Sequence, residues 1–332
     1  MLDQTDMLMY PPHELRQYAF IADGERGAVV GRSGEFCWMC APRWDSDAVF
    51  SSLIGGAGVY AVTPEQSFVW GGYYEPAGLI WRSRWVTTTG IIECREALAF
   101  PGDADRAVLL RRVMAVSGDA RVRVLCDPRP GFGERGLRSP HRDDDGIWED
   151  DLGGLYLRWS GAADASVRTT AVNDPRLEMH LEVPAGSHHD LVLELGDRPL
   201  PDRPVDADRA WRTTEDAWRN SVPRLRTVAD RDSRHAVAVM RGMTSRSGGM
   251  VAAATTSLPE RSGAGRNYDY RYVWIRDQCF AGQAAAAAGV DFLLDEAVRF
   301  VGERMIEDGA GLTPAYTVDG GPLPDQRRLD LP

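Results

Sequence analysis

Short stretches of alternating apolar and polar residues fill the region between about residues 18 and 197. They are separated by glycine, proline and aspartate turns, and examples are GVYAVTP, SFVWGGYY, AVLLRRVMAV and HDLVLELG. Alternation with a period of two places successive side chains on opposite faces of a strand. Many such strands without a long helical period between them predict a β-sandwich. The polar stretch at residues 135–154 is predicted to be a long loop inside that domain.

The pattern becomes helical after a proline-rich break, DRPLPDRPVD. In the next stretch, DADRAWRTTEDAWRNSV, two Ala-Trp pairs recur at helical spacing, which predicts a linker helix. Gly289 and Gly309 are predicted to end two later helices, and Asp291 is the expected N-cap of the second. The three helices expected beyond the linker run from Ser233 to about Thr244, from Trp274 to about Ala288, and from Asp291 to Gly309.

Composition and charge narrow the classes of partner. The chain has 332 residues and a net charge of −11, with acids and bases interleaved and no dense basic patch for nucleic acid. No apolar run approaches the roughly 18 residues of a membrane span. The N-terminus lacks the basic and apolar regions of a secretory signal. We therefore expect a cytoplasmic protein with a neutral substrate that binds neither nucleic acid nor membrane.

The cysteines and histidines do not predict a metal centre. Cys37 and Cys40 form a C-x-x-C, but residues three apart on a strand point to opposite faces, and a second ligand pair is missing. His188 and His189 are adjacent on a predicted strand and face opposite ways for the same reason. The odd total of five scattered cysteines suits a reducing compartment. No metal and no cofactor is expected.

The densest group of reactive and aromatic side chains is the stretch RNYDYRYVWIRDQCF, residues 266–280. Trp274 and Asp277 are three apart and share one face once the helix begins. Arg276 and Asp277 in the first turn offer a guanidinium and a carboxylate, which can hold adjacent sugar hydroxyls. The ring of Tyr270 or Trp274 could pack on the apolar face of that sugar. The same spacing also fits a purely structural role, in which Arg–Asp ion pairs stabilise an aromatic-rich helix start. The spacing leaves both interpretations open.

Two long motifs in this order resemble one known family. SGGMVAAATTSLPE followed by RNYDYRYVWIRD resembles the start of the catalytic domain in glycoside hydrolase family 15, the bacterial glucoamylase and mycobacterial-type trehalase group. Near the N-terminus, IADGERGAVVGRSGEFCWMCAPRWDSDAVF resembles the opening of that group's trehalase-like β-domain. The resemblance covers nearly the whole chain and favours the sugar-binding interpretation.

The resemblance implies a multidomain β plus α fold, in which an N-terminal β-sandwich precedes the beginning of an (α/α)6 barrel. Residues 1–205 would form the trehalase-like β-sandwich domain, residues 206–230 the helical linker, and residues 231–332 the N-terminal part of the catalytic domain. Family members hydrolyse α-glucosidic bonds with inversion, so the implied substrate is trehalose or a maltooligosaccharide. Residues at matching family positions bind the terminal glucose, and they are Tyr270, Trp274, Arg276 and Asp277. Tyr268 stands where bacterial members usually have tryptophan.

Inverting hydrolysis requires a general acid and a general base, two carboxyl groups roughly 6.5–9.5 Å apart. In the family both are glutamates downstream of the WIRD segment, and this chain ends before them. We therefore expect a C-terminally truncated chain with an incomplete barrel that is inactive alone, and no catalytic residue is named. Glu149 lies in DGIWE, which imitates the general-acid motif, but its position upstream predicts an exposed loop acid.

The alternative function is a non-catalytic protein that binds carbohydrate or a partner chain. A partial barrel would leave apolar helix faces open, and such faces call for a covering partner. Either a homo-oligomer or a complementing chain could supply that cover. The side chains expected on these faces are Phe292, Leu293, Val298 and Val301.

Overall fold

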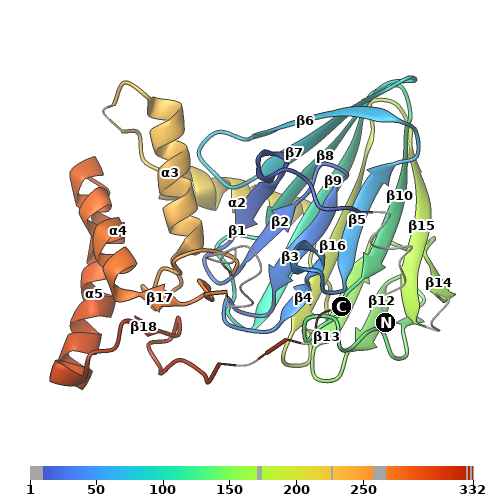
Figure 1. Cartoon of the computed structure of the whole chain (residues 1–332). Coiled ribbons are helices and arrows are strands. Elements are labelled where there is room, and N and C mark those ends of the chain that lie inside the picture. Colours follow the sequence, from blue (N-terminus) through green and yellow to red (C-terminus); the bar gives the residue numbers. More distant parts are fainter. Residues whose placement is uncertain are drawn as a thin grey trace.

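The computed structural model describes residues 10–169, 174–225, 227–256, 267–326, 328–329 and 331 (Figure 1). Within these residues, two eight-stranded antiparallel sheets pack face to face, and helices lie beside them. The strands run from residue 19 to residue 196, so the predicted β-sandwich is confirmed. The second half of the motif VAAATTSLPE, residues 257–260, lies outside the described residues.

The two sheets combine strands from distant parts of the chain. One sheet has the order β1-β2-β3-β5-β10-β15-β14, with β4 paired to β3, and the other has the order β11-β12-β13-β16-β9-β8-β7-β6. The strands of the first sheet are β1 (Ala19–Ala22), β2 (Gly27–Val30), β3 (Glu35–Cys40), β4 (Ala48–Phe50), β5 (Val59–Pro64), β10 (Ala120–Asp127), β14 (Ser166–Thr169) and β15 (Pro175–Val183). Those of the second are β6 (Phe68–Tyr74), β7 (Trp81–Thr87), β8 (Ile91–Leu98), β9 (Arg106–Ser117), β11 (His141–Arg142), β12 (Trp148–Asp151), β13 (Tyr156–Ser160) and β16 (His188–Gly196).

The main core fills the space between the sheets, because alternate strand residues point inward. Leu109 and Val113 of β9 are fully buried there, together with the rings of Trp85 and Trp159. The pattern therefore predicted these strands, although β9 is buried on both faces, since Val108 and Leu110 are buried as well.

One charged side chain crosses that core. Arg111 of β9 is fully buried, and its guanidinium lies 4.6 Å from the ring centre of Phe36 and 4.7 Å from that of Tyr60. Its Nη2 lies 2.5 Å from a carboxylate oxygen of Glu96, which is also fully buried. Nη1 donates to the carbonyl of Tyr60 at 3.0 Å. The sandwich thus encloses a paired charge held by hydrogen bonds and aromatic rings.

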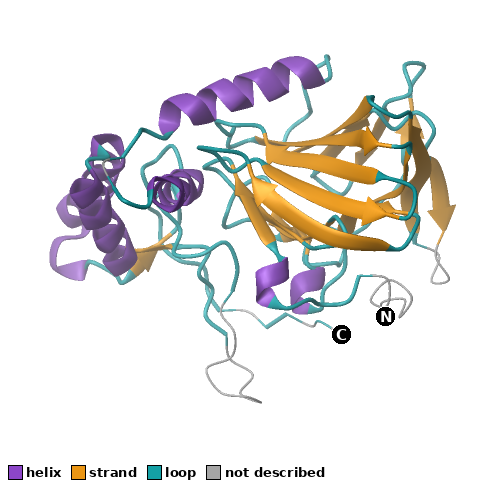
Figure 2. Cartoon of the chain, turned by 90° about the horizontal axis from the view of Figure 1, so that it is seen from above, coloured by secondary structure: helices purple, strands orange, loops and turns teal. Residues whose placement is uncertain are grey.

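The helices lie on the outer side of the second sheet and beyond it, and Figure 2 shows them beside the sandwich. None of the described helices combines the length and the apolarity that a membrane span requires. They are α2 (Ala207–Ser221), α3 (Asp230–Met243), α4 (Ile275–Ala288) and α5 (Asp291–Asp308), with short 3-10 turns η1 (Leu15–Gln17), η2 (Ser52–Ile54) and η3 (Gly309–Gly311).

Tryptophans attach α2 to the sandwich. Asp206 caps this helix by accepting from the backbone N–H of Arg209 at 2.7 Å. Trp211 and Trp218 are buried, and the ring of Trp218 stacks on Phe100 with centroids 3.9 Å apart. The predicted helix is therefore confirmed, and its two tryptophans pack on the sandwich.

A glycine lets α3 approach the sandwich closely. A Cβ added at Gly242 would lie 2.5 Å from Cδ1 of Leu79 and 3.1 Å from the Cβ of Ala22. The carbonyl of Gly242 accepts from the backbone N–H of Gly24 at 2.8 Å. This close contact is possible only because residue 242 has no side chain. Helix α3 begins at Asp230, three residues before the predicted start.

Several sequence-based expectations were wrong. Residues 135–154 are not a long loop, because they hold β11 and β12, and Trp148 of β12 is buried. The buried carboxylate of Asp150 accepts from the backbone N–H of Arg138 at 2.8 Å, so the polar residues here are satisfied locally. Asp291 is the first residue of α5 instead of its cap, since Val290 occupies the capping position.

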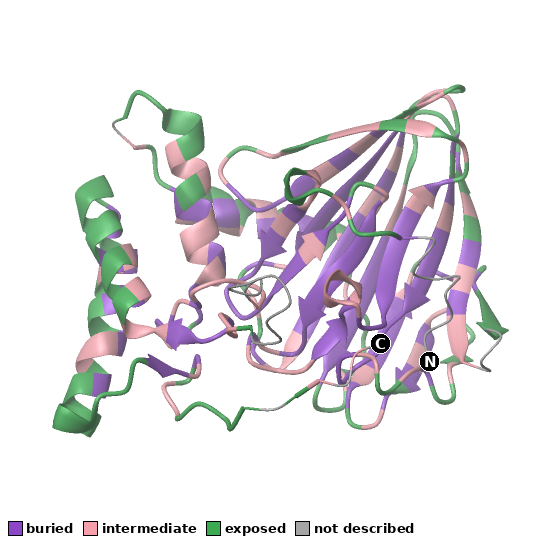
Figure 3. Ribbon diagram, in the orientation of Figure 1, coloured by how far each residue is buried: buried purple, intermediate pink, exposed green. Residues whose placement is uncertain are grey.

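The expected open apolar face of α5 is only partly present. Leu293 is buried against α4, which contradicts the prediction for this residue, whereas Phe292 and Val298 are exposed. Much of α4 and α5 is exposed, as the green ribbon in Figure 3 shows, and this surface includes Phe280 and Ile306 with exposed fractions of 63% and 85%.

Candidate functional site

The segment that leads into α4 is held in place by backbone pairing on two sides. β17 (Val273–Trp274) pairs with β18 (Ala315–Tyr316) in antiparallel register. On the other side, the N–H of Ala253 donates to the carbonyl of Tyr270 at 2.9 Å. Trp274 then occupies the N-cap position with extended backbone angles, and α4 runs to Ala288. The predicted helix and its end at Gly289, a left-handed glycine, are confirmed.

Three aromatic rings form a row along this segment. Tyr268 and Tyr270 are stacked, with centroids 6.5 Å apart and planes within 7°. Tyr270 meets Trp274 edge to face at 6.3 Å. Because all three rings are only partly buried, the row presents an aromatic surface at the start of α4.

The predicted polar residues lie next to this row in the first turn of α4. The guanidinium of Arg276 lies 5.8 Å from the ring centre of Trp274, and its Nη2 is 3.3 Å from Oδ2 of Asp277. Arg276 itself is open to solvent, with its side chain 71% exposed. The structure therefore brings Tyr270, Trp274, Arg276 and Asp277 into one neighbourhood, as their spacing predicted.

Two polar atoms in that neighbourhood are unusual. Nε1 of Trp274 and Oδ2 of Asp277 are both shielded from solvent, and neither makes a hydrogen bond within the described residues, although Oδ2 has the ion-pair contact with Arg276. Buried polar atoms are nearly always hydrogen-bonded, because leaving one unpaired costs about 1–3 kcal/mol. A donor and an acceptor without hydrogen bonds, three residues apart at the start of α4, suit a ligand that carries both functions, such as a pair of hydroxyl groups.

Sequence reasoning missed Gln278, the next residue on α4. It is buried, its Oε1 accepts from the N–H of Met250 at 2.7 Å, and its Nε2 donates to the carbonyl of Gly248 at 2.9 Å. These bonds tie the first turn of α4 to the chain around residue 249. The sequence around Gln278 has no pattern that would distinguish a buried glutamine from an exposed one.

Sequence reasoning also missed Arg271, which lies between Tyr270 and Tyr272. Its side chain is directed into the sandwich, where Nη1 donates to the carbonyl of Ser46 at 2.6 Å. Nη1 also lies 3.2 Å from Sγ of Cys40, and burial raises the pKa of this thiol although Arg271 acts to lower it. The one available signal was alternation, since a residue between two tyrosines in an extended segment faces away from both.

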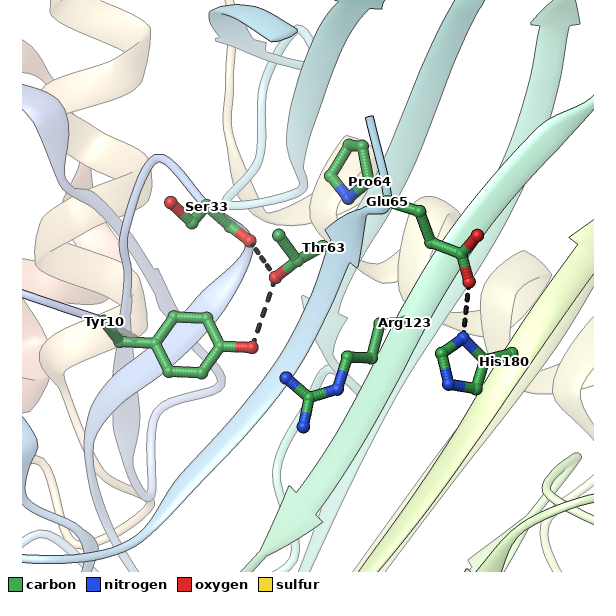
Figure 4. Close-up of a pocket in the computed structure, with 7 residues that line it drawn as sticks. All are labelled: Tyr10, Ser33, Thr63, Pro64, Glu65, Arg123 and His180. Carbon is green, nitrogen blue, oxygen red and sulfur yellow. Dashed lines mark hydrogen bonds and ion pairs between the residues drawn. The ribbon is translucent and has the colours of Figure 1, made fainter. Parts of the chain in front are cut away.

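A cavity of about 420 Å³ lies elsewhere, on the outer side of the first sheet (Figure 4). Most of its polar side chains already have partners. Oγ1 of Thr63 donates to the carbonyl of Ser33 at 2.6 Å, and Nδ1 of His180 lies 2.5 Å from a carboxylate oxygen of Glu65. The residues that line it are Tyr10, Ser33, Thr63, Pro64, Glu65, Arg123 and His180.

His188, taken from the sequence only as part of the pair His188–His189, and Glu149 lie in two other groups of side chains. His188 lies within ligand distance of Asp190 and Asp208, but Nη2 of Arg112 already binds these carboxylates at 2.7 and 2.6 Å. This ion pair accounts for the cluster without a metal. Glu149 is not a loop acid as predicted, because it is part of β12 and its carboxylate accepts from Nε of Arg158 at 2.8 Å.

The cysteines all lie within the described residues and are free of disulfides. Cys37, Cys40, Cys94 and Cys126 are buried, and Cys279 is exposed.

Comparison with known families gives two matches. A family model described as "Trehalase-like, N-terminal" matches residues 10–150, and a model described as "Glycosyl hydrolases family 15" matches residues 235–325. The second match contains the aromatic row and the first turn of α4.

Several curated trehalases are similar to this chain. A trehalase of Mycobacterium tuberculosis is 28% identical over 337 residues, which cover 91% of this chain and 48% of that protein. Trehalase 1 of Sulfolobus acidocaldarius is 27% identical, with 96% and 53% covered. Trehalase 2 of the same organism is 40% identical over 85 residues, which are 25% of this chain and 15% of that protein. The chain therefore spans about half the length of the curated relatives that it matches over most of its own length.

Among solved structures, a bacterial glucoamylase complexed with acarbose is similar to this chain. The TM-score is 0.61 at 14% sequence identity, and the match covers 94% of this chain and 54% of the glucoamylase. At this identity the likeness establishes the fold, which is glucoamylase-like.

Proposed function

The chain belongs to the trehalase-like group of glycosyl hydrolase family 15, and from that premise we propose that it acts on α-glucosides, trehalose or short α-glucans. The terminal glucose would bind at the start of α4. The similar proteins, trehalases and a glucoamylase, support this substrate class.

One observation carries the proposal: Nε1 of Trp274 and Oδ2 of Asp277 are shielded from solvent and make no hydrogen bond within the described part of the chain, Oδ2 having only its ion-pair contact with Arg276. A sugar hydroxyl both donates and accepts, so one hydroxyl could accept from the indole while its neighbour donates to the carboxylate. A ligand without these hydroxyls would leave the two atoms without hydrogen bonds and would be rejected strongly.

The neighbouring side chains have complementary roles in the proposed site. Arg276 would donate from its exposed guanidinium to a second pair of hydroxyl oxygens. Tyr270 would pack against the apolar C–H face of the ring, and Tyr268, stacked on it, would extend this wall. Trp274, Arg276 and Asp277 therefore fix the orientation of the glucose, whereas the tyrosines fix its depth.

The proposed reaction is hydrolysis by a single displacement with inversion at the anomeric carbon. One carboxylic acid protonates the leaving oxygen and one carboxylate removes a proton from the attacking water, so the chemistry needs no cofactor. The residues proposed here bind and orient the glucose, and the acid and the base are left unassigned. Glu149 is not assigned either role, because its carboxylate is engaged by Arg158 on the sandwich.

We further propose that α3, α4 and α5 are opening helices of an (α/α)6 barrel. The proposed division is residues 1–205 for the β-sandwich domain, residues 206–230 for the helical linker, and residues 231–332 for the barrel part. The exposed Phe280, Val298 and Ile306 support the idea that further helices cover α4 and α5.

The same exposed residues favour a second candidate function. A protein that binds carbohydrate or a partner chain without catalysis would also need cover for these helices, from a second copy or from a complementing chain. The two candidates differ in turnover. Release of glucose from trehalose or maltotriose supports the hydrolase, and binding of the sugar without release supports the alternative.

Calorimetric titration with trehalose and with maltotriose tests the proposed site. We expect one of these sugars to bind and Asp277→Asn to weaken its affinity by about 10- to 100-fold, the cost of a lost charged hydrogen bond. Asp291→Asn is the matched control, because it removes an exposed carboxylate from the first turn of the next helix. Absence of binding for both sugars, or equal weakening by the two substitutions, would contradict the proposal.

A further inference from the structure

The side chain of Arg271 connects the proposed glucose site with the β-sandwich. It is 5% exposed, although it belongs to the segment that carries the aromatic row. Its Nη1 donates to the carbonyls of Ser46 at 2.6 Å and Trp44 at 3.4 Å and lies 3.2 Å from Sγ of Cys40. These acceptors belong to β3 and the loop that follows it, 225 to 231 residues earlier in the chain.

Two aromatic rings of the sandwich complete the binding site of the Arg271 side chain, which we call its socket. The guanidinium lies 5.5 Å from the ring centre of Phe132 and 6.0 Å from that of Trp38. Cation–π contacts of this kind strengthen when the cation is removed from water. Trp38 is itself fully buried, and its Nε1 donates to the carbonyl of Ala254 at 2.7 Å, on the strand-like stretch that pairs with the aromatic segment.

The other edge of the same guanidinium faces the glucose segment. Nε donates to Oδ1 of Asp269 at 2.9 Å and Nη2 donates to Oδ2 at 2.6 Å, a bidentate pair. Oδ1 also accepts from the backbone N–H of Arg271 at 3.0 Å, which closes a tight turn between the two stacked tyrosines, Tyr268 and Tyr270. The planar fork thus bonds the sandwich with one nitrogen and the segment with the other two.

We propose that Arg271 is a positioning residue, through which the β-sandwich sets the place of the tyrosine wall at the glucose site. Tyr268 precedes the Asp269–Arg271 turn and Tyr270 lies within it, so a shift of the guanidinium would move both rings relative to Trp274 and Asp277. The inference rests on the proposed function for the identity of the ligand alone. The sandwich would then be a working part of the site instead of an appended domain.

Lysine cannot replace this arginine, because an ammonium group offers one point charge where the socket needs two edges of a planar fork. We expect Arg271→Lys to loosen the segment while the sandwich stays folded. Asp269→Asn is a second, milder variant that weakens the same link from the segment side. Arg111→Lys is the matched control, since it alters a buried, ring-stacked arginine whose partners all lie within the sandwich.

Hydrogen exchange read by mass spectrometry tests the positioning without any sugar. The N–H groups of Ala252 and Ala253 donate to the carbonyls of Tyr272 and Tyr270 and so report on the pairing of the segment. Under conditions where every variant is folded, we expect the peptide that contains Ala252 and Ala253 to exchange at least about tenfold faster in Arg271→Lys and in Asp269→Asn than in the wild type. Unchanged exchange in both variants, or equal acceleration by Arg111→Lys, would overturn the inference.

Titration of the same variants with trehalose and maltotriose separates the two proposals. Affinity about tenfold or more weaker in Arg271→Lys, with Arg111→Lys near the wild-type value, is the expected result, because small displacements of a binding wall are costly. If the wild type binds neither sugar while the exchange result holds, the proposed function fails and the positioning stands. Unchanged sugar affinity in a segment with faster exchange would overturn the role of Arg271 in positioning the site.

Discussion

Two buried arginines, Arg111 in the interior of the sandwich and Arg271 at its junction with the segment before α4, differ in the parts of the chain that they connect. Arg111 pairs with Glu96, and both side chains belong to neighbouring strands of one sheet. Arg271 instead joins Ser46 of the sandwich to Asp269 of the segment before α4. Burial and ring contacts are alike in both places, so they do not distinguish a stabilising role from a positioning one. The two roles are distinguished by where the partners lie, in one sheet for Arg111 and in two parts of the molecule for Arg271.

The largest effect should come from removing the arginine inside the sandwich. Arg111→Met leaves the fully buried carboxylate of Glu96 without its ion pair, and we expect a loss of about 3–5 kcal/mol in the free energy of unfolding. Urea denaturation followed by circular dichroism measures it. Arg111→Met combined with Glu96→Leu should recover much of the loss, since no buried charge remains. A loss below about 1 kcal/mol would show that the pair is not a stabilising unit.

The same pair should also give the variant a pH dependence. Burial raises the pKa of Glu96, although Arg111 acts to lower it. A carboxyl group whose folded pKa lies above its unfolded value destabilises the fold as the pH rises through that window. Without Arg111 the folded pKa rises further, so the deficit of Arg111→Met should be larger at pH 8 than at pH 5, by about 1.4 kcal/mol for each added pKa unit. Equal deficits at the two pH values would contradict this assignment.

At the junction the effect on global stability should be smaller. Arg271→Met removes charge-assisted bonds, but Asp269 keeps 30% of its side-chain surface in solvent and can be rehydrated. We therefore expect a loss of about 1–3 kcal/mol, measured by the same denaturation. A loss as large as that of Arg111→Met would place Arg271 among the stabilising core residues and remove the contrast between the two regions.

The smallest effect should come from a tryptophan at the junction. Trp38→Phe keeps a ring beside Arg271 but loses the hydrogen bond from Nε1 to the carbonyl of Ala254, at about 1 kcal/mol. Trp85→Phe is its counterpart in the sandwich, where Nε1 donates to the carbonyl of Arg32 at 2.9 Å. Both should lower stability similarly, and hydrogen exchange near Ala254 should accelerate in Trp38→Phe alone. Acceleration in both variants would mean that the two regions unfold as one.

Local patterns predicted much of the fold. Alternation identified the strands of the sandwich, and the spacing of Trp211 and Trp218 identified the buried face of α2, because burial on one side leaves a period in the sequence. Residues 135–154 were mistaken for a loop because their polar side chains are satisfied by nearby backbone groups, as Asp150 is. Polar composition alone does not separate that arrangement from exposure to solvent.

Part of the candidate site could likewise be predicted from local sequence patterns, and part could not. Trp274, Arg276 and Asp277 lie within one helical turn, so their proximity follows from their spacing. Arg271 and Gln278 escaped prediction because their partners, Ser46 and Gly248 among them, come from other segments of the chain. Their roles depend on tertiary contacts, which a single sequence does not encode in any local period.

A crystal structure of the protein with maltotriose would test the glucose site most directly. We expect a glucose ring against Tyr270, with hydroxyl oxygens about 2.7–3.2 Å from Nε1 of Trp274 and Oδ2 of Asp277, two atoms that make no hydrogen bond within the described residues. Sugar bound only elsewhere, for instance in the cavity on the first sheet, with these two atoms still without a hydrogen bond, would contradict the proposed glucose site.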